Sequence, residues 1–301
     1  MRNKVFSGID SLPYGRATDE VTPGCLVLEG GAFRGVYEEG VLDALMEAGI
    51  NMECTIGVSA GAMNGMNYVS GQIGRSARIN LRYRHDSRYV GLKALKKNKG
   101  IIGFDFAFGK IADDPFDYER FYRPCQRFIA VATNCLTAEP EYFEKGKCPD
   151  ILEAVRASAS LPFISKEVLI NNIPYLDGGC SVKVPFKWAL DQNFEKIVII
   201  RTRPESWRYP EKNKKKTMPH LFYRSYPKLL EGIDLSHQRY NKNCDEMVKL
   251  KQEGRIFMIC PSRQTDVERL EKDMEKLGVL YYMGYNDAKN IMNELKAYLN
   301  I

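Results

Sequence analysis

The sequence predicts an α/β fold in which a mostly parallel central sheet is flanked by helices. Two observations carry this prediction: strand and helix patterns alternate between residues 24 and 69, and a glycine-rich turn separates each strand from the helix after it. Alternation of this kind is typical of a parallel sheet covered on both faces. The 301 residues, 44% of them hydrophobic and 27% charged, are enough to build a full core.

The first part of this pattern contains two strand-helix units. Residues 24–28 (GCLVL) form a short apolar run typical of a buried strand. Apolar side chains recur at helical spacing in residues 35–48, which predicts a helix there. A second strand is expected to end near Gly57, and the small residues at 60–69 are expected to form the next helix.

The middle of the chain is richer in predicted strands. One apolar strand is expected at 128–133, and another begins around Tyr142. The pattern at 167–176 predicts a hairpin, because Asn171 and Asn172 at its centre are residues that turns favour.

The last third is predicted to contain a short helix, two strands and a helical tail. The helix at 185–190 begins on a proline, which is well tolerated in a first turn because its missing N–H would be unpaired there anyway. Strands are expected at 196–200 and 255–260. The tail at 267–299 has a helical pattern that we expect to break at Gly278.

From these elements we expect three segments. They are an N-terminal extension at 1–23, a core at 24–200, and strands and helices at 201–301 that complete the same domain. A connection rich in proline and lysine is expected to link two strands at 203–227. Long connections of this kind are often functional.

Composition and cysteine spacing argue against several classes of protein. No apolar run approaches the roughly 18 residues of a membrane-spanning helix, and the N-terminus lacks the apolar stretch of a signal peptide. The eight cysteines lie ten or more residues apart, without the paired spacing of a zinc site. We therefore expect a cytoplasmic protein, peripheral to a membrane at most, with no metal and no cofactor.

The first chemical signal is the pentapeptide GVSAG at 57–61, where a predicted strand turns into a helix. In a G-x-S-x-G turn the two glycines, here Gly57 and Gly61, let the backbone crowd together, and the serine hydroxyl is pushed out at the end of the strand. The following helix points its N-terminal dipole at charge that develops near Ser59. The pattern indicates a nucleophilic serine, although a tight glycine turn without chemistry has the same composition.

A second glycine cluster, GGAFRG at 30–35, lies one strand-helix unit earlier. Successive N–H groups at a helix N-terminus bind either a phosphate or a tetrahedral oxyanion. Ala32 interrupts the glycine spacing of a dinucleotide fingerprint, and the chain has no phosphate loop ending in G-K-[ST]. We therefore favour an oxyanion site beside the serine over a phosphate site or a plain turn.

A serine nucleophile needs a general base. The chain has three histidines, all in polar, cationic or proline-rich sequence: His85, His220 and His237. A carboxylate can act instead when it is ionised, partly desolvated and within hydrogen-bond reach. Asp177 is the candidate because it ends an apolar run and is followed by two glycines. An Asp-Gly hairpin turn would have the same pattern.

In order and spacing, these three clusters resemble those of the patatin-like phospholipases. That family has G-G-[GA]-x-[RK]-G after its first strand, G-x-S-x-G one unit later and D-G-[AG] well downstream. Here the three clusters stand at 30–35, 57–61 and 177–179. The small-residue segment ending in proline at 157–162 is also similar to one in the family, and the resemblance covers about 24–200.

The resemblance implies a patatin-like catalytic core, a serine lipid acyl hydrolase that uses a Ser-Asp dyad at the carboxyl ends of the strands and no histidine. Ser59 would be the nucleophile and Asp177 the base. The backbone N–H groups that would form the oxyanion hole are those of Gly30, Gly31 and Ala32. The remaining matching positions are Arg34, Gly35, Gly57, Gly61, Gly178 and Gly179.

Positive charge is concentrated in two segments. Residues 201–228 hold nine Lys or Arg and two Glu, and residues 81–100 hold seven against one Asp, in a chain with a net charge of +6. Together with Trp207 and Tyr209, this charge predicts peripheral contact between 201–228 and an anionic membrane surface. A solvated loop would have the same composition. No nucleic-acid-binding motif accompanies the charge, so no nucleic acid is expected.

Two alternatives stay open on the sequence. One is an α/β-hydrolase-type esterase with a triad of Ser59, Asp177 and either His220 or His237, in the chain order of that class. The other is a non-catalytic lipid- or partner-binding protein whose glycine loop holds a phosphate.

Overall fold

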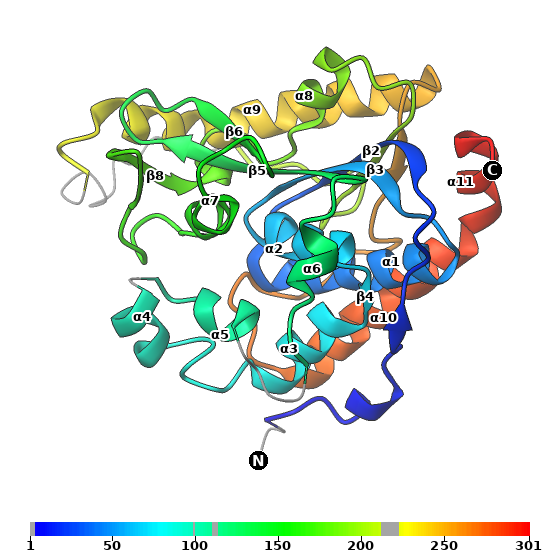
Figure 1. Ribbon diagram of the computed structural model, residues 1–301. Helices are drawn as coiled ribbons and strands as arrows, with labels where there is room; N and C mark the ends of the chain where they lie inside the picture. Colours follow the sequence, from blue (N-terminus) through cyan, green and yellow to red (C-terminus); the bar gives the residue numbers. More distant parts are fainter. Residues whose placement is uncertain (1–3, 99, 110–113, 212–222) are drawn as a thin grey trace.

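The computed structural model describes residues 4–98, 100–109, 114–211 and 223–301. Its centre is an eight-stranded sheet with helices on both faces, which is the predicted α/β fold class (Figure 1). In chain order the strands of this sheet are β2 (Thr22–Leu28), β3 (Met52–Val58), β5 (Arg127–Asn134), β6 (Pro140–Glu144), β7 (Val168–Ile170), β8 (Ile173–Asp177), β9 (Ile197–Ile200) and β10 (Phe257–Ile259). A separate antiparallel pair joins β1 (Gly15–Arg16) to β4 (Gln72–Ile73).

The helices connect these strands, and several of them pack on the sheet. In chain order they are α1 (Val36–Glu47), α2 (Ala60–Val69), α3 (Arg75–Tyr83), α4 (Leu92–Asn98), α5 (Phe104–Phe108), α6 (Tyr118–Phe121), α7 (Ile151–Ser158), α8 (Phe186–Asp191), α9 (Pro227–Gln252), α10 (Met274–Asn290) and α11 (Met292–Leu299). Short 3₁₀ turns are η1 (Ile9–Ser11), η2 (Ala32–Gly35) and η3 (Gly178–Cys180).

The sheet is parallel through most of its width. Strands β10, β9, β2, β3 and β5 lie in this order and are parallel. The antiparallel strand β6 pairs with residues 129–133 of β5 and occupies one edge of that strand. On the other edge, β3 pairs with residues 127–131 and the antiparallel β8 with residues 132–134. The carboxyl ends of β3 and β8 therefore meet beside β5.

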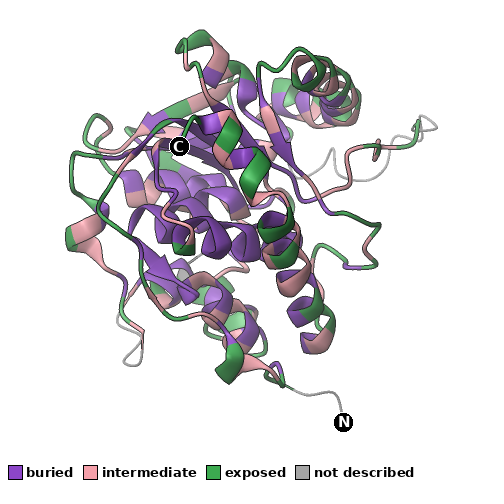
Figure 2. Cartoon of the chain, turned by 90° about the vertical axis from the view of Figure 1, so that its right-hand side faces the viewer, coloured by how far each residue is buried: buried purple, intermediate pink, exposed green. Residues whose placement is uncertain are grey.

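Alternate residues of the central strands face two different cores. Leu26 and Leu28 of β2 belong to a core that includes residues of α1, α2 and α10. Cys25 and Val27 belong to a core with residues of α8 and α9. This period of two is that of a strand buried on both faces. Figure 2 shows the resulting distribution, with buried residues on the sheet and on the inner sides of the helices.

Helices α1 and α10 approach each other closely at two glycines. A Cβ on Gly40 would lie 2.1 Å from the Tyr281 carbonyl oxygen, and a Cβ on Gly284 would lie 1.9 Å from the Tyr37 carbonyl oxygen. Only glycine permits this approach of one backbone to another. The last quarter of the chain thereby packs directly on the first helix after the glycine-rich turn.

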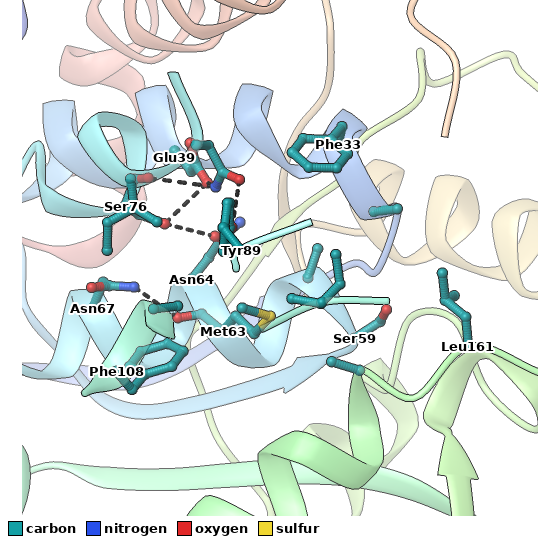
Figure 3. A pocket seen from close by; sticks show the side chains of 17 residues that line it. Phe33, Glu39, Ser59, Met63, Asn64, Asn67, Ser76, Tyr89, Phe108 and Leu161 are labelled. Atoms are coloured by element: carbon teal, nitrogen blue, oxygen red, sulfur yellow. Dashed lines mark hydrogen bonds between the residues drawn. The ribbon is translucent and has the colours of Figure 1, made fainter. Parts of the chain in front are cut away.

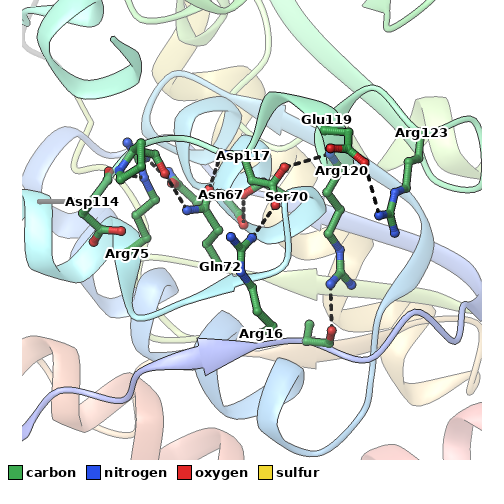
Figure 4. A network of polar contacts seen from close by, with 12 residues as sticks. Arg16, Asn67, Ser70, Gln72, Arg75, Asp114, Asp117, Glu119, Arg120 and Arg123 are labelled. Carbon is green, nitrogen blue, oxygen red and sulfur yellow. Dashed lines mark hydrogen bonds and ion pairs between the residues drawn. The ribbon is translucent and has the colours of Figure 1, made fainter. Parts of the chain in front are cut away.

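A polar network fixes the segments that follow α3 (Figure 4). The guanidinium of Arg75, whose exposed fraction is 0%, donates to Asn67 Oδ1 at 2.7 Å and to the Ala107 carbonyl oxygen at 2.7 Å. It also donates to the Asp114 carbonyl oxygen at 3.1 Å. One buried arginine therefore ties α2 to α5 and to the segment that leads to α6.

The C-terminal third differs from its prediction in two ways. The connection predicted at 203–227 leads into the 26-residue helix α9 rather than directly into a strand. Helix α10 runs through Gly278 without a break and ends at Asn290. A Cβ on Gly278 would lie 2.1 Å from the ring of Phe6, so this glycine makes room for a side chain from the N-terminal segment.

Candidate active site

Ser59 lies at the sharp turn between β3 and α2. Its φ is 57° and its ψ is −121°, a conformation that is strained for a residue other than glycine. A Cβ on Gly57 would lie 2.4 Å from the Gly61 carbonyl oxygen, and one on Gly61 would lie 2.8 Å from that of Leu28. The Ser59 N–H donates to Ser158 Oγ at 2.8 Å. Close packing and this hydrogen bond together hold the turn in its strained form.

Asp177 lies at the carboxyl end of β8, directly beside this turn. Val58 is opposite Val131 of β5, and Asp177 is opposite the next residue, Ala132. Ser59 Oγ donates a hydrogen bond of 2.6 Å to Asp177 Oδ2. The register of three strands thus brings the two predicted residues into contact.

The Asp177 carboxylate is buried, with an exposed fraction of 5%. Its second oxygen, Oδ1, accepts the Gly179 N–H at 2.7 Å. Burial raises the pKa of Asp177 above its ordinary value, and the hydrogen bonds from Ser59 and Gly179 oppose that rise. A Cβ on Gly178 would lie 2.3 Å from the Val131 carbonyl oxygen, so the D-G-G turn fits tightly against β5. The site therefore contains a desolvated base in contact with a hydroxyl.

The three N–H groups of the glycine-rich turn differ in their partners. The Gly30 N–H donates a long hydrogen bond of 3.4 Å to the Lys183 carbonyl oxygen, and its role as an oxyanion donor stays a prediction. A Cβ on Gly30 would lie 2.9 Å from the Ser59 Cβ, which shows how closely the two glycine turns pack. Among the described residues, the N–H groups of Gly31 and Ala32 have no acceptor, and Ala32 has a positive φ of 51°.

Two further positions of this turn have distinct environments. A Cβ on Gly35 would lie 2.9 Å from the Ala60 Cβ, at the start of α2. The Arg34 side chain has an exposed fraction of 6%, and its Nε has no hydrogen-bond partner among the described residues. Burial lowers the pKa of Arg34 to about 10, and the positive charge of Arg203 adds to this effect.

Two cavities meet at Ser59. The smaller one extends from Ser59 along α2 (Figure 3). The larger one also includes Asp177 and Gly31 in its wall. A hydroxyl at the junction of two cavities can contact a bond that joins a group in one cavity to a group in the other.

The smaller cavity changes character along its length. Its apolar lining residues are Ala32, Phe33, Ala60, Met63, Ile79, Ile102, Ala107, Phe108, Ala159 and Leu161. In Figure 3, Glu39 and Ser76 lie at the end away from Ser59, with the polar side chains of Asn64 and Asn67. Glu39 Oε1 accepts a hydrogen bond from Ser76 Oγ at 3.0 Å, and burial raises the pKa of Glu39 to about 8. The far end therefore holds polar side chains beside the ring of Phe108, and Met63 and Leu161 are among the apolar side chains nearer Ser59.

The larger cavity is lined by four cationic side chains and by aromatic rings. The cations are Arg34, Lys183, Arg203 and Arg269. The aromatic side chains in the wall are Phe163, Tyr209, His237 and Tyr240.

The histidines occupy different places. His237 lines the larger cavity, and its ring stacks on that of Tyr209 with centroids 3.6 Å apart. His85 Nε2 lies 2.9 Å from the Lys272 carbonyl oxygen. His220 lies outside the described residues. No histidine is needed to join the serine to the carboxylate, because Ser59 contacts Asp177 directly.

The basic segment predicted to meet a membrane is less exposed than its sequence implies. Arg201 has an exposed fraction of 0% and donates to the Tyr240 hydroxyl at 3.0 Å. Trp207 and Tyr209 pack against each other and against Tyr240. Residues 212–222, with four of the lysines, lie outside the described part. Arg201 and the two aromatic side chains therefore do not form an exposed basic surface.

Sequence reasoning missed several side chains of this site. Ser158 lies in the small-residue segment, but no contact with the serine turn was expected. Lys183 and Arg203 follow β8 and β9, and the rule that sites form beyond the carboxyl ends of strands would have indicated them. Arg269 belongs to no motif and comes from a region that the family resemblance did not include.

Comparison with known proteins identifies the family of this chain. Residues 26–190, more than half of the chain, match the family model described as patatin-like phospholipase. The chain therefore belongs to the patatin-like phospholipase family, as its motifs predict. Residues 226–300 match a second model, described as a domain of unknown function (DUF6363).

Similar proteins include two curated relatives and one solved structure. The uncharacterized protein YjjU of Escherichia coli is 31% identical over 190 residues, which cover 61% of this chain and 53% of YjjU. Lysophospholipase nte1 of Aspergillus terreus is 30% identical over 165 residues, or 51% of this chain and 10% of that protein. The chain thus spans about half of YjjU and a tenth of nte1. The crystal structure of VipD from Legionella pneumophila aligns over 98% of this chain and 71% of its own, with a TM-score of 0.43 and 12% identity.

Within the described residues, no helix is both long enough and apolar enough to span a bilayer.

Proposed function

We propose that this protein hydrolyses acyl esters of lipids through an acyl-Ser59 intermediate, with Asp177 as the general base of a two-residue dyad. The observation that carries the proposal is the 2.6 Å hydrogen bond from Ser59 Oγ to Asp177 Oδ2. A base must be within hydrogen-bond reach of the proton that it removes. The raised pKa of Asp177 supports the same role, because a desolvated carboxylate is a stronger base than one in water.

Acylation follows from this contact. Ser59 Oγ attacks the ester carbonyl carbon while its proton moves to Asp177 Oδ2. The carbonyl oxygen becomes an oxyanion, for which the N–H groups of Gly31 and Ala32 are the proposed donors. When the intermediate collapses, the bond to the alcohol oxygen breaks, and that oxygen takes the proton from Asp177.

Deacylation uses the same groups again. Water attacks the acyl-Ser59 carbonyl carbon and gives a proton to Asp177. Collapse of the second intermediate breaks the bond to Ser59 Oγ, which recovers that proton, and a fatty acid leaves. The dyad returns to its starting state, so one carboxylate accounts for both half-reactions.

The two cavities give the substrate an orientation. We assign the acyl chain to the smaller cavity, whose walls near Ser59 are apolar. The alcohol and its head group then lie in the larger cavity. An acyl chain gains roughly 0.8 kcal/mol for each methylene group that it buries, so the apolar walls favour this orientation.

The test is labelling and turnover with matched variants. A fluorophosphonate probe should label the parent protein at Ser59 and should not label Ser59→Ala. Fatty acid should be released from a lysophospholipid by the parent and by His237→Ala, but not by Ser59→Ala. An unlabelled but folded parent protein would favour the non-catalytic lipid-binding alternative. Loss of turnover in His237→Ala would favour a triad instead.

Two further expectations remain proposals. We propose that residues 24–301 form one domain, supported by the close packing of α10 on α1. We also propose contact with an anionic membrane through the remaining cations of 201–228. The test is vesicle binding of a variant in which Lys212, Lys214, Lys215 and Lys216 are replaced by Gln. Equal binding of parent and variant would contradict the membrane contact.

A further inference from the structure

The larger cavity has more positive than negative charge in its wall. Its four cations, Arg34, Lys183, Arg203 and Arg269, make no ion pair with a carboxylate in the part of the chain that the structure describes. They also influence one another: Arg203 and Arg269 both help to lower the pKa of Arg34. Burial is the main cause of the lowered pKa of Lys183, about 8, and Arg269 contributes to it. Cations this close to each other are stabilised by a bound anion.

The two carboxylates of the cavity already have partners. Glu29 Oε1 accepts the Tyr240 hydroxyl at 2.6 Å, and its Oε2 accepts the Thr202 N–H at 2.6 Å. Glu29 also lies 4.0 Å from Arg201, on the core side. Both oxygens of Asp177 are occupied by the serine hydroxyl and a backbone N–H. Neither carboxylate forms an ion pair with one of the four cations among the described residues, although Glu29 partly offsets the lowering of the pKa of Arg34 and Asp177 that of Lys183.

One of the four cations is more than nine-tenths buried and incompletely bonded. Arg34 has an exposed fraction of 6%, and its Nε has no partner among the described residues. A buried guanidinium that leaves a donor unpaired costs free energy, so its position is explained best by a ligand that it bonds. The same side chain lines the cavity that contains Ser59.

The C-terminal region supplies both a wall and a cation of this cavity. Helix α9 contributes Ile233, Ser236, His237 and Tyr240. The segment before α10 contributes Arg269, whose carbonyl oxygen accepts the Phe33 N–H at 3.1 Å. The carbonyl oxygens of the next two residues accept hydrogen bonds from the Arg84 guanidinium at 2.8 and 2.6 Å. The segment that carries Arg269 is therefore bound to the glycine-rich turn.

We propose that residues 226–300, the region of unknown function, complete an anion subsite in which Arg269, together with Arg34, Lys183 and Arg203, binds the phosphate of a lipid head group. This inference rests on the proposed function, because it places the phosphate on the alcohol side of the ester that Ser59 attacks. Arginine is suited to phosphate by its fork of donors. Region 226–300 is then part of the substrate site and more than a structural appendage.

The charge of the wall also selects among head groups. A phosphocholine carries an ammonium group that would face the same four cations, with no unpaired carboxylate of this cavity to bind it. A phosphate monoester or a phosphoglycerol carries net negative charge and meets no such opposition. We therefore expect lysophosphatidic acid to be a better substrate than lysophosphatidylcholine, and a monoacylglycerol of the same chain to be the poorest.

The experiment compares these three substrates, below their micellar concentrations, with p-nitrophenyl butyrate as a soluble ester without phosphate. In the parent protein, kcat/KM should be roughly tenfold higher for lysophosphatidic acid than for the monoacylglycerol. In Arg269→Gln that preference should fall by roughly tenfold, while kcat/KM for p-nitrophenyl butyrate changes much less, because that ester has no phosphate. Arg269 is exposed at the mouth of the cavity, so its replacement leaves the core intact.

A matched control and a second measurement separate the outcomes. Arg263→Gln removes an exposed arginine of the same region that lines another cavity, and it should change nothing. Inorganic phosphate should inhibit p-nitrophenyl butyrate hydrolysis competitively in the parent, with an inhibition constant raised roughly tenfold by Arg269→Gln. Equal kcat/KM for all three lipids, or an equal loss on every substrate in Arg269→Gln, would overturn the subsite. Absence of turnover on every ester, the soluble one included, would instead refute the proposed hydrolase.

Discussion

Ser59 Oγ and Asp177 Oδ2 are 2.6 Å apart although the two residues are separated by 118 positions in the chain. They meet because β3 and β8 both pair with the same edge of β5. Strand β3 is parallel to β5 and β8 is antiparallel to it, so their carboxyl ends face each other. A shift of either strand by one residue would turn one of the side chains to the opposite face of the sheet. The antiparallel part of the sheet is therefore what brings the carboxylate to the serine.

The glycine-rich turn gives a prediction about turnover. A Cβ on Gly31 would lie 2.8 Å from Thr202 Oγ1, so a side chain there displaces the proposed oxyanion donors. We expect Gly31→Val to lower kcat by roughly a hundredfold or more with little change in KM, as loss of one oxyanion donor does. The matched test compares Gly31→Ala alone with the double variant Gly31→Ala, Thr202→Ala. Removal of Thr202 Oγ1 makes room for the new methyl group and should restore part of kcat. A raised KM at unchanged kcat would indicate a ground-state phosphate site instead.

The shape of the smaller cavity gives a prediction about acyl chains. From Ser59 to Asn67, α2 advances by eight residues, or about 12 Å. An extended chain covers about 3.5 Å for every three bonds, so about ten bonds span this length before the polar end is reached. We expect kcat/KM for p-nitrophenyl esters to be highest at chains of roughly eight to ten carbons and to fall beyond them. In Ala107→Val the maximum should move to shorter chains, while acetate ester hydrolysis remains as in the parent. A steady rise up to sixteen carbons would contradict this assignment of the cavity.

The subsite proposed for phosphate predicts a dependence on pH. Burial lowers the pKa of Lys183 to about 8, so this side chain loses its positive charge as the pH rises through that value. The preference for lysophosphatidic acid over the monoacylglycerol should therefore decrease between pH 7 and 9. In Lys183→Gln the preference should be small and independent of pH over the same range. A parent protein whose preference stays constant to pH 9 would exclude Lys183 from phosphate binding.

Two buried carboxyls on α1 predict how stability depends on pH. Burial raises the pKa of Glu39 to about 8 and that of Asp43 to about 7. In the unfolded chain the pKa of each carboxyl is about 4. Between these values the folded state binds more protons than the unfolded state, so the free energy of unfolding should fall as the pH rises from 5 to 8. Glu39→Gln should reduce that fall by roughly 2 to 4 kcal/mol in urea unfolding, and Glu20→Gln, at an exposed position, should not. A stability that rises from pH 5 to 8 in the parent would contradict the raised pKa values.

The fold class and the two residues of the proposed dyad could be predicted because local patterns encode them. Apolar strands followed by glycine turns mark the parallel core, and the G-x-S-x-G and D-G-G turns are short segments whose backbone geometry requires glycine at fixed places. The hairpin at Asn171 and Asn172 is confirmed for the same reason, since both residues have a positive φ.

Other features depend on contacts between distant segments, which no local pattern encodes. Gly278 looked like a helix break, but it makes room for Phe6 within α10. The contact between the Gly30 N–H and the Lys183 carbonyl oxygen likewise joins segments far apart in the chain. Helix α9 did leave a signal, because Leu229, Ser236 and Tyr240 recur at helical spacing, but polar residues between them weakened it. The cations of the larger cavity come from four separate segments and converge only in the folded chain.

The most direct test of the proposed dyad is the acylation rate of Asp177→Asn, measured as the pre-steady-state burst with a soluble p-nitrophenyl ester. Asparagine keeps the shape of the side chain but cannot accept the serine proton, so we expect the burst rate to fall by roughly four orders of magnitude or more with the fold intact. In the parent protein the rate should rise with pH through the raised pKa of Asp177 and then stay level, as the carboxylate loses its proton. A burst in folded Asp177→Asn within tenfold of the parent rate would show that Asp177 is not the base that activates Ser59.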